Sequence, residues 1–122
     1  MTKGTVLVID DDPFIAEFLE QALEDEGYRV LTSVNGEALA LAHSQHPDLI
    51  LLDIMMPGMD GVEVSHRLRA NPTTANIPIV AMSAQDRLEV TVARMQVNDQ
   101  LPKPFDLARL FTTIERWITT DQ

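Results

Sequence analysis

The stretch Leu49-Ile50-Leu51-Leu52-Asp53 is an apolar run that ends in a carboxylate, and Ile54-Met55-Met56-Pro57-Gly58 follows it. A short apolar run bounded by turn residues is typical of a strand that is buried on both faces of a sheet. An ionised carboxylate is costly to bury unless it is paired or bound to a metal, so a strand that stops on one often presents it for chemistry. The alternative is that Asp53 merely begins a turn, and the other strand ends decide between the two interpretations.

Length and composition limit the class of protein. The chain has 122 residues, which fits a single domain over residues 1–122. It contains no cysteine, which excludes disulfides, thiolate zinc sites and cysteine nucleophiles. The net charge of −10 opposes binding to nucleic acid or to anionic lipid. No signal stretch and no membrane-spanning run is found, so we expect a cytoplasmic protein whose partners are cations and proteins.

Short apolar runs alternate with segments of helical period, which predicts βα units and a parallel sheet covered by helices on both faces. The predicted strands cover residues 5–9, 28–32, 49–52, 77–82 and, with a short last strand, 98–101. The predicted helices run from residue 13 to before Gly27, from 35 to about 45, from 60 to about 70, from about 86 to 95, and from about 106. The fold class is therefore α/β, a doubly wound five-stranded parallel sheet.

Three features of the predicted helices concern their caps and their apolar faces. Asp12 is suited to cap the first helix and Pro13 to occupy its first position, followed by an apolar stripe formed by Phe14, Ile15, Phe18, Leu19, Ala22 and Leu23. Asp60 with Glu63 resembles a capping box for the third helix. Trp117 is expected at an edge of the core, on the margin of the apolar face of the last helix.

Polar residues follow four of the five predicted strands: Asp10-Asp11-Asp12, Asp53, Ser83-Ala84 and Pro102-Lys103-Pro104. In an open α/β sheet, ligands bind beyond the carboxyl ends of the strands where the strand order reverses. The order 2-1-3-4-5 would place Asp10, Asp11 and Asp53 in one pocket there. Carboxylates so close together destabilise one another unless a cation neutralises them. Mg²⁺ meets that need because it prefers oxygen ligands, whereas the three histidines fall on predicted helices.

A carboxylate can attack phosphorus and form an acyl phosphate when the phosphoryl oxygens are neutralised. Mg²⁺ and Lys103 can supply the positive charge, and the Ser83 hydroxyl can donate a hydrogen bond to a phosphoryl oxygen. Taken singly, Lys103 is more simply a solvated lysine and Ser83 a helix cap. Their occurrence together at one edge of one sheet favours the phosphoryl site.

At these residues the chain closely resembles the receiver domain of two-component response regulators, the family of the chemotaxis protein CheY, which has a flavodoxin-like (βα)5 fold. The resemblance covers nearly the whole chain. It rests on Val8-Ile9-Asp10-Asp11-Asp12, on Asp48-Leu49-Ile50-Leu51-Leu52-Asp53 with Met56-Pro57-Gly58-Met59-Asp60-Gly61, on Ala81-Met82-Ser83-Ala84, and on Leu101-Pro102-Lys103-Pro104-Phe105.

The resemblance implies a role for each site residue. Asp53 is the expected phosphoacceptor, Ser83 the hydroxyl that moves to meet the phosphate, and Lys103 the ion-pairing lysine. Asp11, Asp53 and the backbone carbonyl of Met55 are the expected Mg²⁺ ligands, with Asp10 acting through water. A cis peptide between Lys103 and Pro104 is implied as well. Met55 and Gln85 are expected to border the path of attacking water.

The resemblance also implies what the chain does and with whom. The phosphoryl donor is a sensor histidine kinase or a phosphotransfer protein, and phosphorylation switches binding to a downstream protein that the sequence does not name. The chain is not an enzyme beyond self-phosphorylation from phosphodonors and slow autodephosphorylation. A homodimer through the fourth helix, the fifth strand and the fifth helix is allowed, direct contact with nucleic acid or membrane is not expected, and the chain boundaries favour a stand-alone receiver.

The chain departs from the family pattern before Lys103. Gln100 stands where receivers usually carry Tyr or Phe, and Gln96-Val97-Asn98-Asp99 replaces the common Gly-Ala-Asp-Asp. The fourth helix and the fifth strand are therefore expected to be short or irregular. We expect phosphorylation to be kept and the output face to be rebuilt.

Two other functions are compatible with parts of the sequence. The first is a receiver-like interaction module that binds partners regardless of phosphate, which the replacement at Gln100 suggests. The second is a phosphohydrolase of the haloacid dehalogenase type, for which Asp10 and Asp12 have the required spacing. Phe14 and the short chain disfavour this second alternative.

Overall fold

A computed structural model describes residues 2–33, 37–56, 59–84 and 96–118, with the backbone alone for residues 55, 56, 59, 60 and 84. Its main sheet is parallel and consists, in spatial order, of β2 (Arg29–Ser33), β1 (Thr5–Ile9), β3 (Leu49–Asp53), β6 (Ile79–Ala84) and β7 (Asp99–Lys103). A short antiparallel ribbon, β4 (Met55–Met56) with β5 (Met59–Asp60), follows β3. Counted along the chain, the five main strands have the predicted order 2-1-3-4-5.

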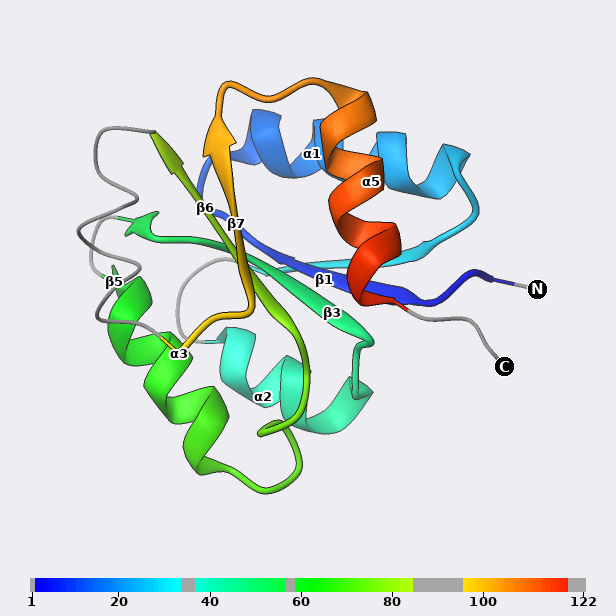
Figure 1. The fold of residues 1–122 in the computed structure, drawn as a ribbon. Coiled ribbons are helices and arrows are strands. Elements are labelled where there is room, and N and C mark those ends of the chain that lie inside the picture. Colours follow the sequence, from blue (N-terminus) through cyan, green and yellow to red (C-terminus); the bar gives the residue numbers. More distant parts are fainter. Residues whose placement is uncertain (1, 34–36, 57–58, 85–95, 119–122) are drawn as a thin grey trace.

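Helices cover both faces of the sheet, as Figure 1 shows. One face carries α1 (Pro13–Asp25) and α5 (Leu107–Trp117), and the other carries α2 (Glu37–Gln45) and α3 (Gly61–Ala70). The predicted helix at residues 86–95, Gln85, and the turn residues 35, 36, 57 and 58 lie outside the described residues.

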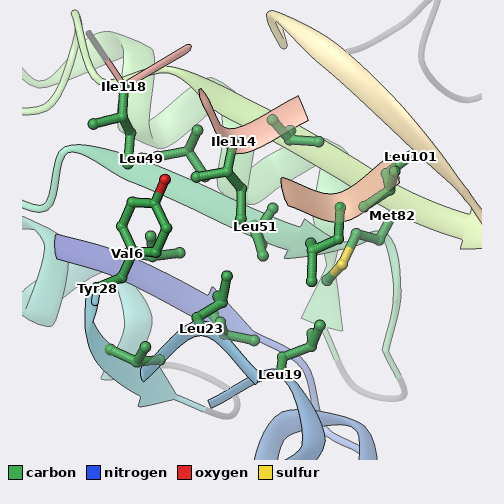
Figure 2. Packing of buried hydrophobic residues seen from close by; sticks show 14 residues of the cluster. Val6, Leu19, Leu23, Tyr28, Leu49, Leu51, Met82, Leu101, Ile114 and Ile118 are labelled. Atoms are coloured by element: carbon green, nitrogen blue, oxygen red, sulfur yellow. The ribbon is translucent and has the colours of Figure 1, made fainter. Parts of the chain in front are cut away.

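The central strand β3 supplies both hydrophobic cores because its side chains alternate between the two faces. Ile50 and Leu52 pack into the cluster under α2 and α3, whereas Leu49 and Leu51 pack into the cluster under α1 and α5, which Figure 2 shows. All five residues of the strand are buried. The apolar run of residues 49–52 is therefore the central strand of the sheet, and its carboxyl end determines the position of Asp53.

The fourth and fifth strands of the sheet lie a little later in the chain than predicted. Strand β6 begins at Ile79 rather than Ile77, because Ile77 still belongs to a turn in which its backbone N–H donates to Thr74 O at 3.2 Å. Strand β7 runs from Asp99 to Lys103 and pairs with β6 in continuous register. The expectation of a short or irregular fifth strand was therefore wrong: Asp99 and Gln100, two of the changed residues, lie within β7 and still pair in register with Val80 and Ala81 of β6.

The cap of the first helix is confirmed, whereas the expected stripe is only partly buried. Asp12 is the N-cap of α1 and Pro13 is at its start, and the helix buries Ala16, Leu19 and Leu23. Phe14 is 81% exposed and Phe18 is 52% exposed, because these two residues, four apart, share a face that lies beside the buried one.

At the edge of the sheet opposite the strand carboxyl ends, the start of β1 lies against the end of α5. A Cβ atom built on Gly4 would lie 3.2 Å from Cγ2 of Ile118. Trp117, one residue earlier, packs at the margin of the core as predicted. The capping box predicted for Asp60 depends on a side chain outside the described atoms. Among the described helices, none is both long enough and apolar enough to cross a membrane.

Candidate phosphoacceptor site

The polar residues at the strand ends meet at one edge of the sheet. Asp10 directly follows β1, and Asp53 ends β3, its neighbour in the sheet. Strand β6 pairs with β3 on the other side, with Met82 opposite Asp53, so that Ser83 is one residue beyond. Lys103 ends β7 opposite Ala84 of β6. The predicted convergence of these four residues is therefore confirmed at the level of strand register.

Three carboxylates form a cluster at this edge. Asp10, Asp11 and Asp53 each offer an oxygen atom, and these atoms lie within 4.8 Å of one another. Asp10 and Asp53 are buried, whereas Asp11 is exposed at the mouth of the site. Two buried acids and one open to solvent can hold a cation that keeps part of its hydration shell.

Lys103 provides the positive charge inside the site. Its Nζ atom lies 3.4 Å from Oδ2 of Asp10 and 3.5 Å from Oδ2 of Asp53, and the side chain is 25% exposed. Both contacts are long for charged hydrogen bonds, which are usually about 2.7–2.9 Å. The ammonium group therefore sits between the two acids without closing tightly on either. The bond between Lys103 and Pro104 is a cis peptide, as the resemblance implies.

The electrostatic balance of the site disfavours charge on Asp10. Burial raises the pKa of the Asp10 carboxyl above its usual range, and the nearby charge of Asp53 contributes to the increase. The hydrogen bond from Asp12 N–H and the charge of Lys103 act in the opposite direction. Because the raising effects are stronger, the charged form of Asp10 carries a net cost in free energy, which a further cation would relieve.

Ser83 has an unusual environment for a hydroxyl group. Its Oγ atom is buried, and among the described residues it has no hydrogen-bond partner. A buried polar group without a partner costs free energy, and in a native protein such a group commonly binds an ion, a water molecule or a ligand. The hydroxyl does not cap a described helix, so it is available to donate a hydrogen bond to a bound oxyanion.

The donor atoms suit Mg²⁺. They are all oxygens, and the sequence supplies no cysteine. Met55 is the second residue after Asp53 and lies in β4, so its backbone carbonyl is a candidate ligand as well. Carboxylates supplemented by a carbonyl and water are a usual ligand set for this hard cation. His43 and His66 lie in α2 and α3, His46 follows α2, and none belongs to the cluster.

The third acid of the first loop has a different role. Oδ1 of Asp12 accepts hydrogen bonds from the backbone N–H groups of Phe14 at 3.0 Å and Ile15 at 3.5 Å. Its carboxylate therefore faces the start of α1, and Asp12 is not part of the acidic cluster. This geometry does not supply the paired Asp10 and Asp12 carboxylates that a phosphohydrolase of the haloacid dehalogenase type would use.

An apolar groove borders the site, and the sequence did not predict it. It has a volume of about 340 Å³ and is lined by Ile15, Phe18 and Leu19 of α1 and by Lys103, Pro104 and Phe105 after β7. The apolar pattern of the helix predicts that Phe14 and Phe18 belong to its core stripe, whereas in the structure Phe18 lines the groove. One signal in the sequence could have indicated an exposed apolar surface. Phe14 and Phe18 are four residues apart and form an apolar face beside the buried one, so the helix has more apolar surface than one core-facing stripe requires.

Comparison with known proteins agrees with this geometry. The model of the family described as response regulator receiver domain matches residues 6–115. The probable transcriptional regulatory protein TcrX of Mycobacterium tuberculosis is 39% identical over 107 residues, which are 84% of this chain and 44% of TcrX. The response regulator PleD of Caulobacter vibrioides is 41% identical over 115 residues, 92% of this chain and 25% of PleD. The chain thus spans less than half the length of either relative.

A solved structure extends the comparison to three dimensions. The receiver domain of the sensor histidine kinase PA1611 from Pseudomonas aeruginosa superposes with a TM-score of 0.88 at 31% identity, covering 94% of this chain and 97% of that one. That structure has a magnesium ion coordinated in its active-site cleft. Sequence, fold and the convergence of acids, hydroxyl and lysine lead to one conclusion: the chain belongs to the response regulator receiver domain family.

Proposed function

We propose that this chain is the phosphoacceptor of a two-component or phosphorelay system and that Asp53 carries the phosphoryl group. The observation that supports the proposal most strongly is the 3.5 Å contact between Oδ2 of Asp53 and Nζ of Lys103. On the neighbouring strand, the buried Oγ of Ser83 has no hydrogen-bond partner among the described residues. A carboxylate nucleophile, a cation and a spare donor are what transfer of a phosphoryl group to an aspartate requires.

In the proposed reaction an oxygen of Asp53 attacks phosphorus in line with the leaving group of the donor. With a phosphohistidine donor, the P–N bond breaks, its electron pair stays on the imidazole nitrogen, and a P–O bond to Asp53 forms. Lys103 leaves its shared position between Asp10 and Asp53 and pairs with a phosphoryl oxygen. The Ser83 hydroxyl donates a hydrogen bond to another phosphoryl oxygen, which gives it the partner that it lacks among the described residues.

The residues that would hold Mg²⁺ are Asp11, Asp53 and the backbone carbonyl of Met55, with Asp10 acting through water. When bound, the ion supplies positive charge to the phosphoryl oxygens. The chain's own contribution is to keep the acids together before the ion arrives, through the sheet register and the ammonium group of Lys103.

The apolar groove is the proposed contact surface for the protein donor, a sensor histidine kinase or a phosphotransfer protein. Lys103 lines the groove and also contacts Asp53, so a protein seated there lies next to the acceptor. Phe18, at 52% exposure, presents apolar surface of the kind that anchors protein contacts. Phe18→Ala should slow phosphotransfer from the donor protein but leave labelling by acetyl phosphate unchanged. A loss of both would contradict a docking role.

The face formed by β7 and α5 is the proposed output surface, through which phosphorylation would switch binding to a downstream protein or a second copy of the chain. Gln100 is exposed on β7, where the family usually has an aromatic residue. We therefore propose that the pocket is kept while its readout differs. Amide chemical shifts near Gln100, with and without beryllofluoride, test this, and a propagation like that of aromatic-switch receivers would contradict it. Sedimentation velocity under the same conditions tests dimer formation.

Incubation with radiolabelled acetyl phosphate and Mg²⁺ tests the proposed function directly. The wild type should incorporate label and lose it slowly, and Asp53→Asn should incorporate none because the amide is not a nucleophile toward phosphorus. Asp106→Asn, an exposed acid at the start of α5, is a matched control that should label normally. An unlabelled wild type would favour the alternative of a phosphate-independent interaction module. Label on Asp53→Asn would place the acceptor elsewhere.

A further inference from the structure

The loop after β1 divides three consecutive acids between two tasks. Asp10 and Asp11 contribute oxygen atoms to the cluster with Asp53, and Asp12 does not. Asp12 is exposed and has an extended backbone, with φ −85° and ψ 109°, directly before α1. Asp12 is therefore the residue through which the chain passes from the site into the helix.

Asp12 makes hydrogen bonds both to the site and to α1. Its backbone N–H donates to Oδ1 of Asp10 at 2.9 Å, which occupies one oxygen of the buried acid and leaves Oδ2 facing Lys103. Its side chain accepts from Phe14 N–H at 3.0 Å, and its carbonyl accepts from Ala16 N–H at 3.0 Å. One residue thus joins the acid of the site to the first turn of α1.

The side-chain cap determines where the backbone N–H of Asp12 lies. An N-cap residue is fixed in position because its side chain satisfies helix N–H groups that otherwise lack partners. If the cap is lost, residue 12 gains conformational freedom, and its bond to Oδ1 of Asp10 no longer has a fixed donor. Asp10 and Asp11, its immediate neighbours, are then held less firmly opposite Asp53.

We propose that Asp12 is a positioning residue for the Mg²⁺ site: it is not a ligand, and by capping α1 it holds Asp10 and Asp11 in the arrangement that accepts the ion. This inference rests on the proposed function and adds a residue to it.

Two substitutions at Asp12 separate capping from charge. Asn caps a helix about as well as Asp but carries no charge, and Ala neither caps nor carries charge. Titration of the metal-free protein with MgCl₂, followed by calorimetry and by amide chemical shifts, gives the dissociation constant. Asp12→Asn should stay within about twofold of the wild type. Asp12→Ala should bind about fivefold more weakly, the factor that corresponds to a typical lost cap.

Asp106→Ala is the matched control. Asp106 caps α5 because its Oδ1 atom accepts a hydrogen bond from Arg109 N–H at 2.8 Å, and among the described residues it is not part of the acidic cluster. Its loss should lower the thermal midpoint as Asp12→Ala does while leaving the affinity for Mg²⁺ unchanged. Asp12→Ser, a third capping residue, should restore the affinity that Asp12→Ala loses, and it provides a second folded variant if the alanine protein is unstable.

The outcomes are distinct. Equal weakening by Asp12→Asn and Asp12→Ala would show that charge matters and capping does not, which overturns the inference. Unchanged affinity in Asp12→Ala, or an equal loss in Asp106→Ala, would overturn it too. A wild-type protein that binds no Mg²⁺ would instead contradict the proposed function itself, whatever the variants do.

Discussion

At the scale of single residues, the site could be predicted from the sequence because Asp10, Asp53 and Ser83 directly follow or end apolar runs, and Lys103 follows the last predicted strand. The ends of parallel strands meet at one edge, so one assumption about strand order sufficed to bring Asp10, Asp53, Ser83 and Lys103 together. For Asp12, the sequence predicted only its role as a helix cap. Its backbone bond to Asp10 depends on loop geometry, which spacing does not determine.

Neutralising Asp10 should stabilise the metal-free protein. Asp10 is fully buried, and both its burial and the charge of Asp53 raise its pKa, so the charged form costs folding free energy. Asp10→Asn keeps an oxygen for the Asp12 N–H and removes the charge. We expect a thermal midpoint several degrees higher at pH 7 in EDTA, where each kcal/mol corresponds to roughly 3–6 °C.

The control for Asp10→Asn is Asp106→Asn, which removes an equal charge from an exposed cap and should change the midpoint little. In saturating Mg²⁺ the order should reverse, because the wild type gains more from the ion. A lower midpoint for Asp10→Asn in EDTA would mean that its bond to Lys103 outweighs the cost of burial.

At the scale of elements, the sequence predicted every described strand of the main sheet and every described helix, with small shifts at the ends. Both shifted strands are bounded by side chains that bind backbone groups. The guanidinium of Arg69 binds the carbonyls of Ala75 and Ile77 at 2.9 and 2.7 Å, and Oδ1 of Asn98 accepts from Ile79 N–H at 2.9 Å. These bonds join residues 6, 8 and 19 positions apart through side chains that bind backbone groups, so strand and helix periodicity does not reveal them.

Asp99 ties the start of β7 to the end of α5. Its Oδ2 atom accepts from Trp117 Nε1 and from Arg116, both at 2.8 Å, and Oδ1 accepts from Gln100 N–H. Burial alone would raise the pKa of Asp99, but the hydrogen bonds from Trp117, Gln100 and Arg116 and the charge of Arg116 outweigh it, so the pKa is lowered. The link lies beside Gln100, on the face proposed for output.

Asp99→Asn should therefore destabilise the protein at neutral pH and much less in acid. A carboxyl group with a lowered folded pKa stabilises the fold above its ordinary value of 3.8 and loses that contribution as the pH falls through the folded value. We expect a loss of about 1–2 kcal/mol at pH 7 in urea unfolding, because bonds to a charged acceptor are stronger than neutral ones and the exposed Arg116 adds little.

The comparison with the wild type should be repeated at pH 3, where the difference should shrink. Trp117→Phe, which removes one donor and keeps the charge, should retain part of the pH dependence. If the difference in free energy of unfolding between the wild type and Asp99→Asn stays constant from pH 7 to pH 3, the charge of Asp99 does not contribute to the stability of this contact between β7 and α5.

At the scale of the whole molecule, the acidic edge is a local excess of charge on a chain whose net charge is −10. A ligand that binds only the folded state stabilises it, by about 2.7 kcal/mol at a hundredfold excess over its dissociation constant. Adding Mg²⁺ should therefore raise the thermal midpoint, and EDTA should reverse the rise. The increment should be largely lost in Asp53→Asn.

Choline chloride at matched ionic strength separates specific binding from screening. Screening acts on all exposed charges, whereas the proposed ligands lie at one edge of the sheet. If choline chloride raised the thermal midpoint as much as Mg²⁺ does, the acidic cluster would only be a source of charge repulsion that salt screens, and not a binding site.

The close approach of Gly4 to Ile118 has a practical consequence. Both residues lie at the edge opposite Asp53, and the strand from Thr5 to Ile9 separates them from the acids by roughly 17 Å, at about 3.3 Å per residue. Fluorescent proteins inserted next to Gly4 and Ile118 would be attached close to each other and away from Asp53, the proposed acceptor. A single molecule could then report, through energy transfer between the two labels, whether phosphorylation alters the packing of α5 against the sheet.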